Sequence, residues 1–133
     1  MRKSLKVVAF GGDPADAFLK AAGITDATIT SAVKTLVRGL QADGLWSKMK
    51  AIYPMVGGNA TAHSYNLKDT TKFQITWSGG ITHSSTGVLP NGTNGYGNTG
   101  LIPSLSLLQN SASASFYSRT NTNTGWDLSL IHI

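Results

Sequence analysis

Histidine and aspartate are the main side chains of this chain that could carry acid–base chemistry or hold a metal, because it contains no cysteine and no glutamate. His63, His83 and Asp69 offer two imidazoles and one carboxylate, which are ligands that Zn²⁺ accepts in proteins. Their spacing neither requires nor forbids that they meet in space, and without cysteine no thiolate zinc site can form. We therefore predict neither a metal nor a cofactor.

Serine stands beside histidine at two places, His63-Ser64 and His83-Ser84. Neither serine lies in a Gly-x-Ser-x-Gly motif, the sharp turn that exposes a nucleophilic serine in one large class of hydrolases. Glycoside hydrolysis usually takes two carboxylates, and the second half of the chain offers only Asp69 and Asp127. We predict that the protein is not an enzyme. The alternative is a polysaccharide depolymerase or hydrolase that uses His83 or Asp69.

The segment Gly95 to Gly100, GYGNTG, has the glycine spacing of a dinucleotide-binding loop. That loop works only between a strand and the first turn of a helix, where backbone N–H groups point at the phosphates. Pro103 follows closely, and we expect it to prevent such a helix. The glycines therefore indicate turns and not a nucleotide site.

The uncharged stretch from Trp77 to Gly100 is the best candidate for binding without catalysis. Its amides, hydroxyls and aromatic ring suit the hydroxyl groups and the apolar ring faces of sugars. The same residue types also make bare turns, so a purely structural module without ligand is the alternative. The candidate ligand-binding residues are His83, Asn91, Thr93, Asn94 and Tyr96.

The formal net charge of +5 comes from eleven basic and six acidic side chains, which are spread along the chain without a dense block. No basic helix stripe and no alternation of basic and aromatic residues accompany this charge, so we predict no specific nucleic-acid recognition. The apolar run from Val7 to Phe10 is too short for the core of a signal peptide. No run approaches the length of a membrane-spanning helix, so we expect no membrane insertion.

Two helices are predicted in the first part of the chain. Asp13 can cap the first, with Pro14 at its first position and Gly23 after its end. The second carries apolar residues at intervals of three and four, with Thr25 as its expected cap and Gly44 after its end. We expect the two helices to pack through Phe18, Leu19, Val33, Leu36, Val37 and Leu40.

Strands separated by turns rich in glycine, asparagine and serine are predicted after the helices. Lys72 to Ser78 is the clearest strand, because apolar and polar side chains alternate along it. Lys50 to Val56 and Ser113 to Thr120 are further predicted strands, and Pro54 places the former at an edge or a strand end. These patterns predict an α+β fold in which two short N-terminal helices precede an antiparallel β-sheet. The residues of the clearest strand that we expect to face the core are Phe73, Ile75 and Trp77.

The sequence from Asp13 to Arg119 resembles a group of uncharacterised bacteriophage and prophage proteins found near virion and tail genes. The matching segments are FLKAAGITDATITSAVKTLV, LWSKMKAIYPMVGG, YNLKD, THSSTGVLPNGTNGYGNT and SFYSRTN. In that group a short helical segment precedes what looks like a concanavalin A-like, laminin-G-type β-sandwich, a jelly roll often used to recognise glycans. The resemblance implies a non-enzymatic virion or tail-associated protein with a lectin-like module, assembled in the host bacterial cytoplasm. It implies other virion or tail subunits and a cell-surface glycan as partners.

This chain departs from that group in two ways. The sandwich of the group is longer than the part of this chain after Trp46, so several later strands are missing. The segment Leu128 to Ile133, LSLIHI, resembles a translated sequencing adapter, and a genuine closing strand is the alternative. We therefore expect an incomplete jelly roll on a C-terminally truncated chain. Its expected parts are a helical segment (1–46), a partial β-sandwich (47–127) and a non-native tail (128–133).

Overall fold

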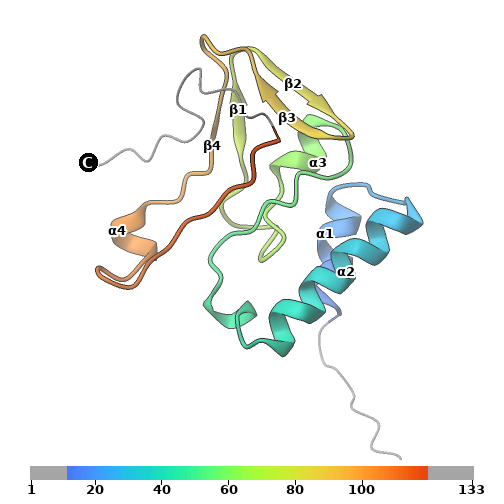
Figure 1. The fold of residues 1–133 in the computed structure, drawn as a ribbon, viewed down its shortest axis with the longest axis vertical. Coiled ribbons are helices and arrows are strands. Elements are labelled where there is room, and N and C mark those ends of the chain that lie inside the picture. The colour runs from blue at the N-terminus through green and yellow to red at the C-terminus, as the bar shows by residue number, and fades with distance from the viewer. Residues whose placement is uncertain (1–11, 120–133) are drawn as a thin grey trace, which may run out of the picture. The chain divides into compact units, whose positions relative to one another are not determined.

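The computed structural model describes residues 12–119. The expectations for Val7 to Phe10, Asp127 and the tail 128–133 lie outside the described residues. The chain divides into two compact units, Met1–Leu101 and Ile102–Ile133, and each is described by itself. Short helices and small antiparallel sheets occur together, which confirms the α+β class (Figure 1). Within the described range, no helix combines the length and the apolar character needed to span a bilayer.

Both predicted N-terminal helices are present. Helix α1 spans Pro14–Ala21, and the carboxylate of Asp13 caps it by accepting a backbone hydrogen bond from its first turn. Helix α2 spans Ala27–Ala42, and its cap is Asp26 and not Thr25. Both residue types make good N-caps, so two adjacent candidates leave the helix start uncertain by one position from sequence alone.

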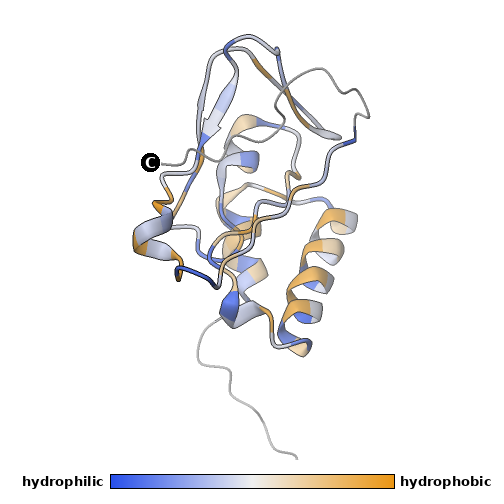
Figure 2. Ribbon diagram, turned by 60° about the vertical axis from the view of Figure 1, so that its left-hand side comes forward, coloured by the Kyte–Doolittle hydropathy of each residue, from blue (hydrophilic) through white to orange (hydrophobic). Residues whose placement is uncertain are grey.

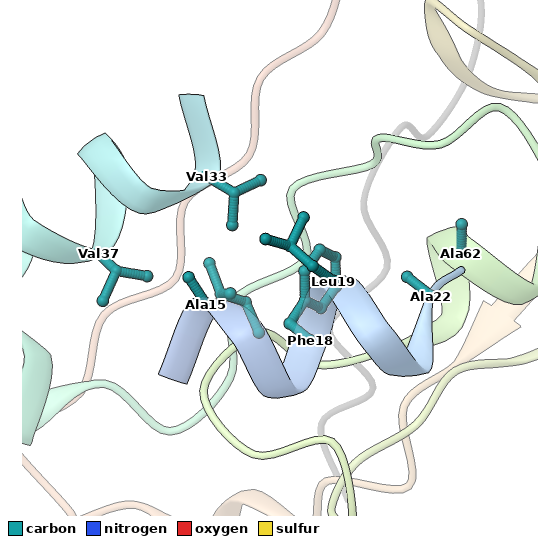
Figure 3. Packing of buried hydrophobic residues seen from close by; sticks show 8 residues of the cluster. Ala15, Phe18, Leu19, Ala22, Val33, Val37 and Ala62 are labelled. Atoms are coloured by element: carbon teal, nitrogen blue, oxygen red, sulfur yellow. The ribbon is translucent and has the colours of Figure 1, made fainter. Parts of the chain in front are cut away.

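The two helices pack on a core that also includes residues from beyond Trp46 (Figure 3). Phe18 of α1 is fully buried, and it belongs to the same cluster as Val33 and Val37 of α2. The helices and the following segment thus share one core, and the expected division at residue 46 does not separate compact units. The buried members of the cluster are Ala15, Phe18, Leu19, Ala22, Val33, Val37, Ala62 and Leu67.

Leu36 does not belong to this core, because 41% of its surface is exposed. Helix α1 has eight residues and covers only a narrow strip of the sixteen-residue α2, and that strip contains Val33 and Val37. Leu36 points about 100° around the helix from Val37 and falls outside the strip. Both helices carry apolar and polar residues in turn along the ribbon (Figure 2).

Leu36→Ala should lower the free energy of unfolding by less than about 1 kcal/mol, because much of the side chain already meets solvent. Val37 is the next residue along the helix, and Val37→Ala removes fewer atoms than Leu36→Ala does. It should nevertheless lower the free energy of unfolding by about 2 kcal/mol, because Val37 is fully buried. Urea unfolding of the two variants measures both changes. A larger loss for Leu36→Ala than for Val37→Ala would contradict this placement.

The predicted strand from Lys50 to Val56 is absent. Pro54 has no N–H to donate, and Met55 has a φ of 54°, which lies outside the strand region. The N–H of Ile52 donates to the side chain of Asn66 at 2.9 Å, where a strand would pair with another backbone. An asparagine thus takes the place of a neighbouring strand here.

Two short helices in this part of the chain were not predicted. They are the 3-10 helix η1 (Trp46–Lys48) and helix α3 (Ala60–Ser64). The side chain of Asn59 caps α3 by accepting from the backbone of Ala62 at 2.9 Å. A helix of five residues has too few positions to show an apolar period, and the glycines before Asn59 indicated only a turn.

Four short strands form two nested antiparallel pairs (Figure 1). The outer pair is β1 (Thr76–Ser78) with β4 (Tyr96–Asn98). The inner pair, β2 (Ile81–Ser84) with β3 (Gly87–Pro90), is a hairpin that lies between them in sequence. The described residues thus contain two two-stranded sheets, joined as a ribbon by Gly79–Gly80 on one side and residues 91–95 on the other.

The ribbon turns a sharp corner at Gly79 and Gly80. Gly79 has a φ of 71°, and a Cβ atom there would lie 2.0 Å from the carbonyl oxygen of Asn94. The ring centroids of Trp77 and His83 are 4.9 Å apart, whereas six residues of straight strand would span about 20 Å. The corner therefore brings β2 back over the side chain of Trp77.

The predicted alternation from Lys72 to Ser78 is confirmed in the burial of the side chains. Ile75 is buried and Phe73 and Trp77 are half-buried, while the polar residues between them are exposed. Only the last three residues form a strand, because Phe73 has a φ of 56° and breaks the extended backbone.

In the second unit, helix α4 (Pro103–Ser106) begins at the proline that we expected to prevent a helix. Proline is tolerated at the first helical position, where an N–H would have no acceptor within the helix. The predicted strand from Ser113 to Thr120 is not formed in its described part, 113–119, whose side chains are exposed. A strand is stabilised by pairing with a neighbouring strand, and no strand of the described part of the chain pairs with this segment.

Candidate functional site

The structure brings together His63 and His83, which the sequence had offered as separate candidates. His63, on α3, is 1% exposed, and His83, on β2, is half-buried. Their Nδ1 atoms are 2.9 Å apart, and their ring centroids are separated by 5.1 Å. The indole of Trp77 lies edge-on to His83, and its Nε1 donates to the carbonyl of Ala60 at 3.0 Å. Elements α3, β1 and β2 therefore meet at the histidine pair.

One hydrogen lies between the two Nδ1 atoms, because one imidazole donates and the other accepts. Nε2 of His63 is buried and has no hydrogen-bond partner in the described structure. A buried N–H without an acceptor is costly, so the favoured tautomer of His63 carries its hydrogen on Nδ1 and donates to His83. Burial, and secondly the nearby His83, lower the pKa of His63, which keeps this imidazole neutral.

Asp69 does not join the two histidines. Its carboxylate accepts from the hydroxyl and the N–H of Thr71 at 2.6 and 3.0 Å, and Nζ of Lys72 is 3.5 Å away. These contacts, first the hydrogen bond from the Thr71 hydroxyl, lower the pKa of Asp69. Between residues 12 and 119, no three or more His, Cys, Asp or Glu side chains gather where they could hold a metal.

The histidine pair alone fits a metal poorly. A metal on Nδ1 of His63 would move the ring hydrogen to Nε2, which is buried without an acceptor. Metal-binding histidines normally donate that second N–H to a carboxylate, a carbonyl or water. The pair is better described as a hydrogen bond between the two rings.

The serines beside the histidines bond to groups other than the imidazoles, and Ser64 Oγ accepts from Nε2 of Gln74 at 3.0 Å. Ser64 Oγ donates to the carbonyl of Thr61 at 2.7 Å, and Ser84 Oγ lies 2.9 Å from Oγ1 of Thr86. A nucleophilic serine is activated by a hydrogen bond to a base, and within the described residues neither hydroxyl makes one to an imidazole.

Asn91 and Asn94 build the corner of the ribbon. Oδ1 of Asn91 accepts from the N–H groups of Thr93, Asn94 and Gly95, each at 3.0 Å. Its Nδ2 donates to Oδ1 of Asn94 at 2.8 Å, and that oxygen also accepts from the N–H of Gly80 at 3.2 Å. Through these contacts Asn91 and Asn94 form a turn, which is the alternative to ligand binding that the sequence left open.

Tyr96 lies on the other side of the ribbon from His83. Tyr96 pairs with Ser78, so their side chains share one face of the β1–β4 pair, whereas Trp77 pairs with Gly97 on the opposite face. His83 packs against Trp77, and Tyr96 is 59% exposed. The five sequence candidates therefore do not form one site. They divide into a corner (Asn91, Thr93, Asn94), an inner contact (His83) and an exposed face (Tyr96).

Trp77 is a packing residue on the inner face. A Cβ atom on Gly97 would lie 2.6 Å from its ring and 2.8 Å from Cγ2 of Ile75. Both side chains thus rest directly on the backbone of β4, which requires glycine at this position.

Comparisons with protein-family models, with curated proteins and with solved structures found no match to this chain. In the described residues three places offer contacts that bear on function: the histidine pair, the corner loop and the face that carries Tyr96.

Sequence reasoning missed two polar side chains that bond to the backbone of other segments, one of them buried and the other half-buried. Asn66 is fully buried and bonds to four backbone groups. The hydroxyl of Tyr53 donates to the carbonyl of Phe73, and burial raises the pKa of Tyr53 to about 12, so it stays a donor. No local pattern marks either residue, because apart from Lys68 their partners lie six to twenty positions away.

Proposed function

We propose that this chain is a non-enzymatic structural component of a bacteriophage virion, associated with the tail, whose lectin-like module of jelly-roll type binds a neutral surface glycan. The observation that carries the glycan assignment is an exposed aromatic ring on an uncharged strand face. The virion assignment rests on the resemblance of Asp13 to Arg119 to phage proteins. The antiparallel ribbon is compatible with one part of a β-sandwich.

The glycan-facing surface is the outer face of the β1–β4 pair. Thr76 pairs with Asn98 and Ser78 pairs with Tyr96, so the four side chains point to the same side. Thr76, Tyr96 and Asn98 are exposed, and Ser78 is half-buried. None of the four carries a charge.

This face has the chemistry that a neutral sugar needs. The ring of Tyr96 can stack on the apolar C–H face of a pyranose. The hydroxyls and the amide around it can donate to and accept from sugar hydroxyls. Because the face offers no cation, it favours a neutral glycan over an acidic one. Asn91 and Asn94 act indirectly in this proposal, by fixing the corner that joins β4 to the inner hairpin.

Tyr96→Ala should weaken glycan binding about tenfold, since stacking would be lost while the core stays intact. The measurement is binding of the wild type and the variant to a glycan array, followed by titration with the best ligand. Tyr117→Ala is the matched control, because it removes a tyrosine that is 88% exposed in the second unit. The glycan assignment is wrong if Tyr96→Ala binds as tightly as Tyr117→Ala, or if the wild type binds no glycan.

A purely structural module is the second candidate, and the second unit provides an observation in its favour. Among residues 102–119 no side chain is buried, although several large apolar ones are present. Large apolar side chains left exposed can mark an interface with another protein. A wild-type chain that binds no glycan but cosediments with virion subunits would favour this candidate. The side chains concerned are Ile102, Leu105, Leu108, Phe116 and Tyr117.

A further inference from the structure

We propose that the contact between His63 and His83 is an acid-sensitive latch, which holds the β2–β3 hairpin on α3 at neutral pH and releases it when the pair takes up protons. The latch does not depend on the proposed glycan function, because its residues lie on the opposite side of the ribbon from Tyr96.

The histidine hydrogen bond is a direct polar link between α3 and β2 of the hairpin. Trp77 adds an edge contact to His83 and a hydrogen bond to the carbonyl of Ala60. The loop before α3 also touches the hairpin turn, since a Cβ atom on Gly58 would lie 3.4 Å from the nitrogen of Ser85. The pairing between β2 and β3 is internal to the hairpin and can persist without α3.

The contact responds to acid because protonation changes the number of hydrogens between the two Nδ1 atoms. Two neutral imidazoles share one hydrogen across the 2.9 Å between their Nδ1 atoms. Two imidazolium rings would bring two hydrogens and two positive charges into that space. The hydrogen bond is therefore lost when both rings are protonated.

Adding even one proton to the histidine pair is unfavourable. A proton on His63 places hydrogen on both of its nitrogens, including the buried Nε2 that has no acceptor. A proton on His83 makes its Nδ1 a donor, so His63 must accept and move its own hydrogen to the same buried Nε2. Either route buries an unpaired N–H, which agrees with the lowered pKa of His63.

Charged groups nearby do not offset this cost. Among the described residues, the elements packed on the pair contribute Trp77, Ala60 and the turn at Ser85, none of which is charged. The charged side chains that follow α3 in sequence are engaged elsewhere. Lys68 donates to the carbonyl of Trp46, Asp69 accepts from Thr71, and Lys72 pairs with Asp69.

The sign of the pH dependence follows from the lowered pKa. The folded state prefers neutral His63, while the unfolded or released state takes up a proton near the ordinary histidine pKa of about 6.5. The latch therefore contributes its full stability above about pH 6.5 and loses it as the pH falls toward the lowered pKa. Release should occur on the acid side of that value.

A pH titration of the full chain by ¹⁵N–¹H NMR from pH 8 to pH 5 tests the latch. The titration should be carried out on a chain that carries His132→Gln, because this third histidine lies outside the described residues. We expect the amide shifts of residues 62–64 and 82–84 to change together below pH 6.5, with a Hill coefficient above 1 and approaching 2. The amides of Val33 and Val37 should not change, because the helical core stays folded.

His83→Gln provides the matched variant, since its amide oxygen can accept from Nδ1 of His63 but cannot be protonated. It should lower the Hill coefficient of the transition to 1 or abolish the transition. An unchanged transition in this variant overturns the latch, as does a transition that Val33 and Val37 share. If the variant does not fold, the ring nitrogen shifts of the wild type decide. At pH 8, His63 should carry its hydrogen on Nδ1, and two protonated rings that still show contacts to each other would contradict the proposal.

Discussion

Phe18→Ala should lower the free energy of unfolding by about 3 to 5 kcal/mol, the range typical of a buried phenylalanine that is cut back to a methyl group. Phe18 is fully buried and is among the largest side chains of the described core. Three of its neighbours in the cluster are alanines, Ala15, Ala22 and Ala62, which are too small to move into the cavity. Urea unfolding followed by circular dichroism measures the loss.

Phe116→Ala is the matched control, because the same atoms are removed from a ring that is 57% exposed. It should change the free energy of unfolding by less than about 1 kcal/mol. A domain of this size is stable by only about 5 to 15 kcal/mol, so Phe18→Ala can approach complete unfolding. Phe18→Leu leaves a smaller cavity and gives a measurable value in that case. Equal losses for Phe18→Ala and Phe116→Ala would contradict the core described here.

The helices could be predicted because their signals are local. Asp13 and Pro14 define the start of α1 within two adjacent residues, and the spacing of Val33 and Val37 gives the buried face of α2. The width of that face could not be predicted, since it depends on what covers it. Leu36 fits the apolar period of the helix as well as Val37 does, but the short α1 leaves it exposed.

The strands were harder to predict because each depends on a partner. The segments 50–56 and 113–119 have the composition of strands, but neither pairs with another described strand. A strand gains its stability from cross-strand contacts, so composition alone does not create one. The strand β4, in contrast, lies in a glycine-rich stretch with low strand propensity, and it forms because the ribbon places it beside β1.

The candidate site also depends on contacts between distant residues, which the sequence alone does not reveal. His63 and His83 are twenty positions apart, and they meet only because the ribbon turns at Gly79 and Gly80. Residue types could suggest that these imidazoles do chemistry, but no spacing rule could predict a hydrogen bond between them. Tyr96 and His83 looked like one binding set in sequence, and the register of β1 with β4 places them on opposite faces.

Asn66 connects the parts of the first unit that lack regular secondary structure. Its Oδ1 accepts from the N–H groups of Ile52 and Lys68 at 2.9 and 3.0 Å. Its Nδ2 donates to the carbonyls of Lys72 and Lys50 at 3.2 and 3.4 Å. One buried side chain thus holds together the segment before α3 and the segment that leads into β1.

Asn66→Ala should therefore lower the free energy of unfolding by about 2 to 5 kcal/mol, because it leaves buried backbone donors and acceptors without partners. Asn91→Ala is the matched control, since Asn91 also makes four hydrogen bonds but is exposed at the corner loop. Water can replace the lost partners at the corner, so this variant should lose about 1 kcal/mol or less. Chemical denaturation of both variants compares two asparagines with the same number of bonds and different burial. If Asn91→Ala proves as costly as Asn66→Ala, then the number of hydrogen bonds, and not the exclusion of water, decides the stability of this unit.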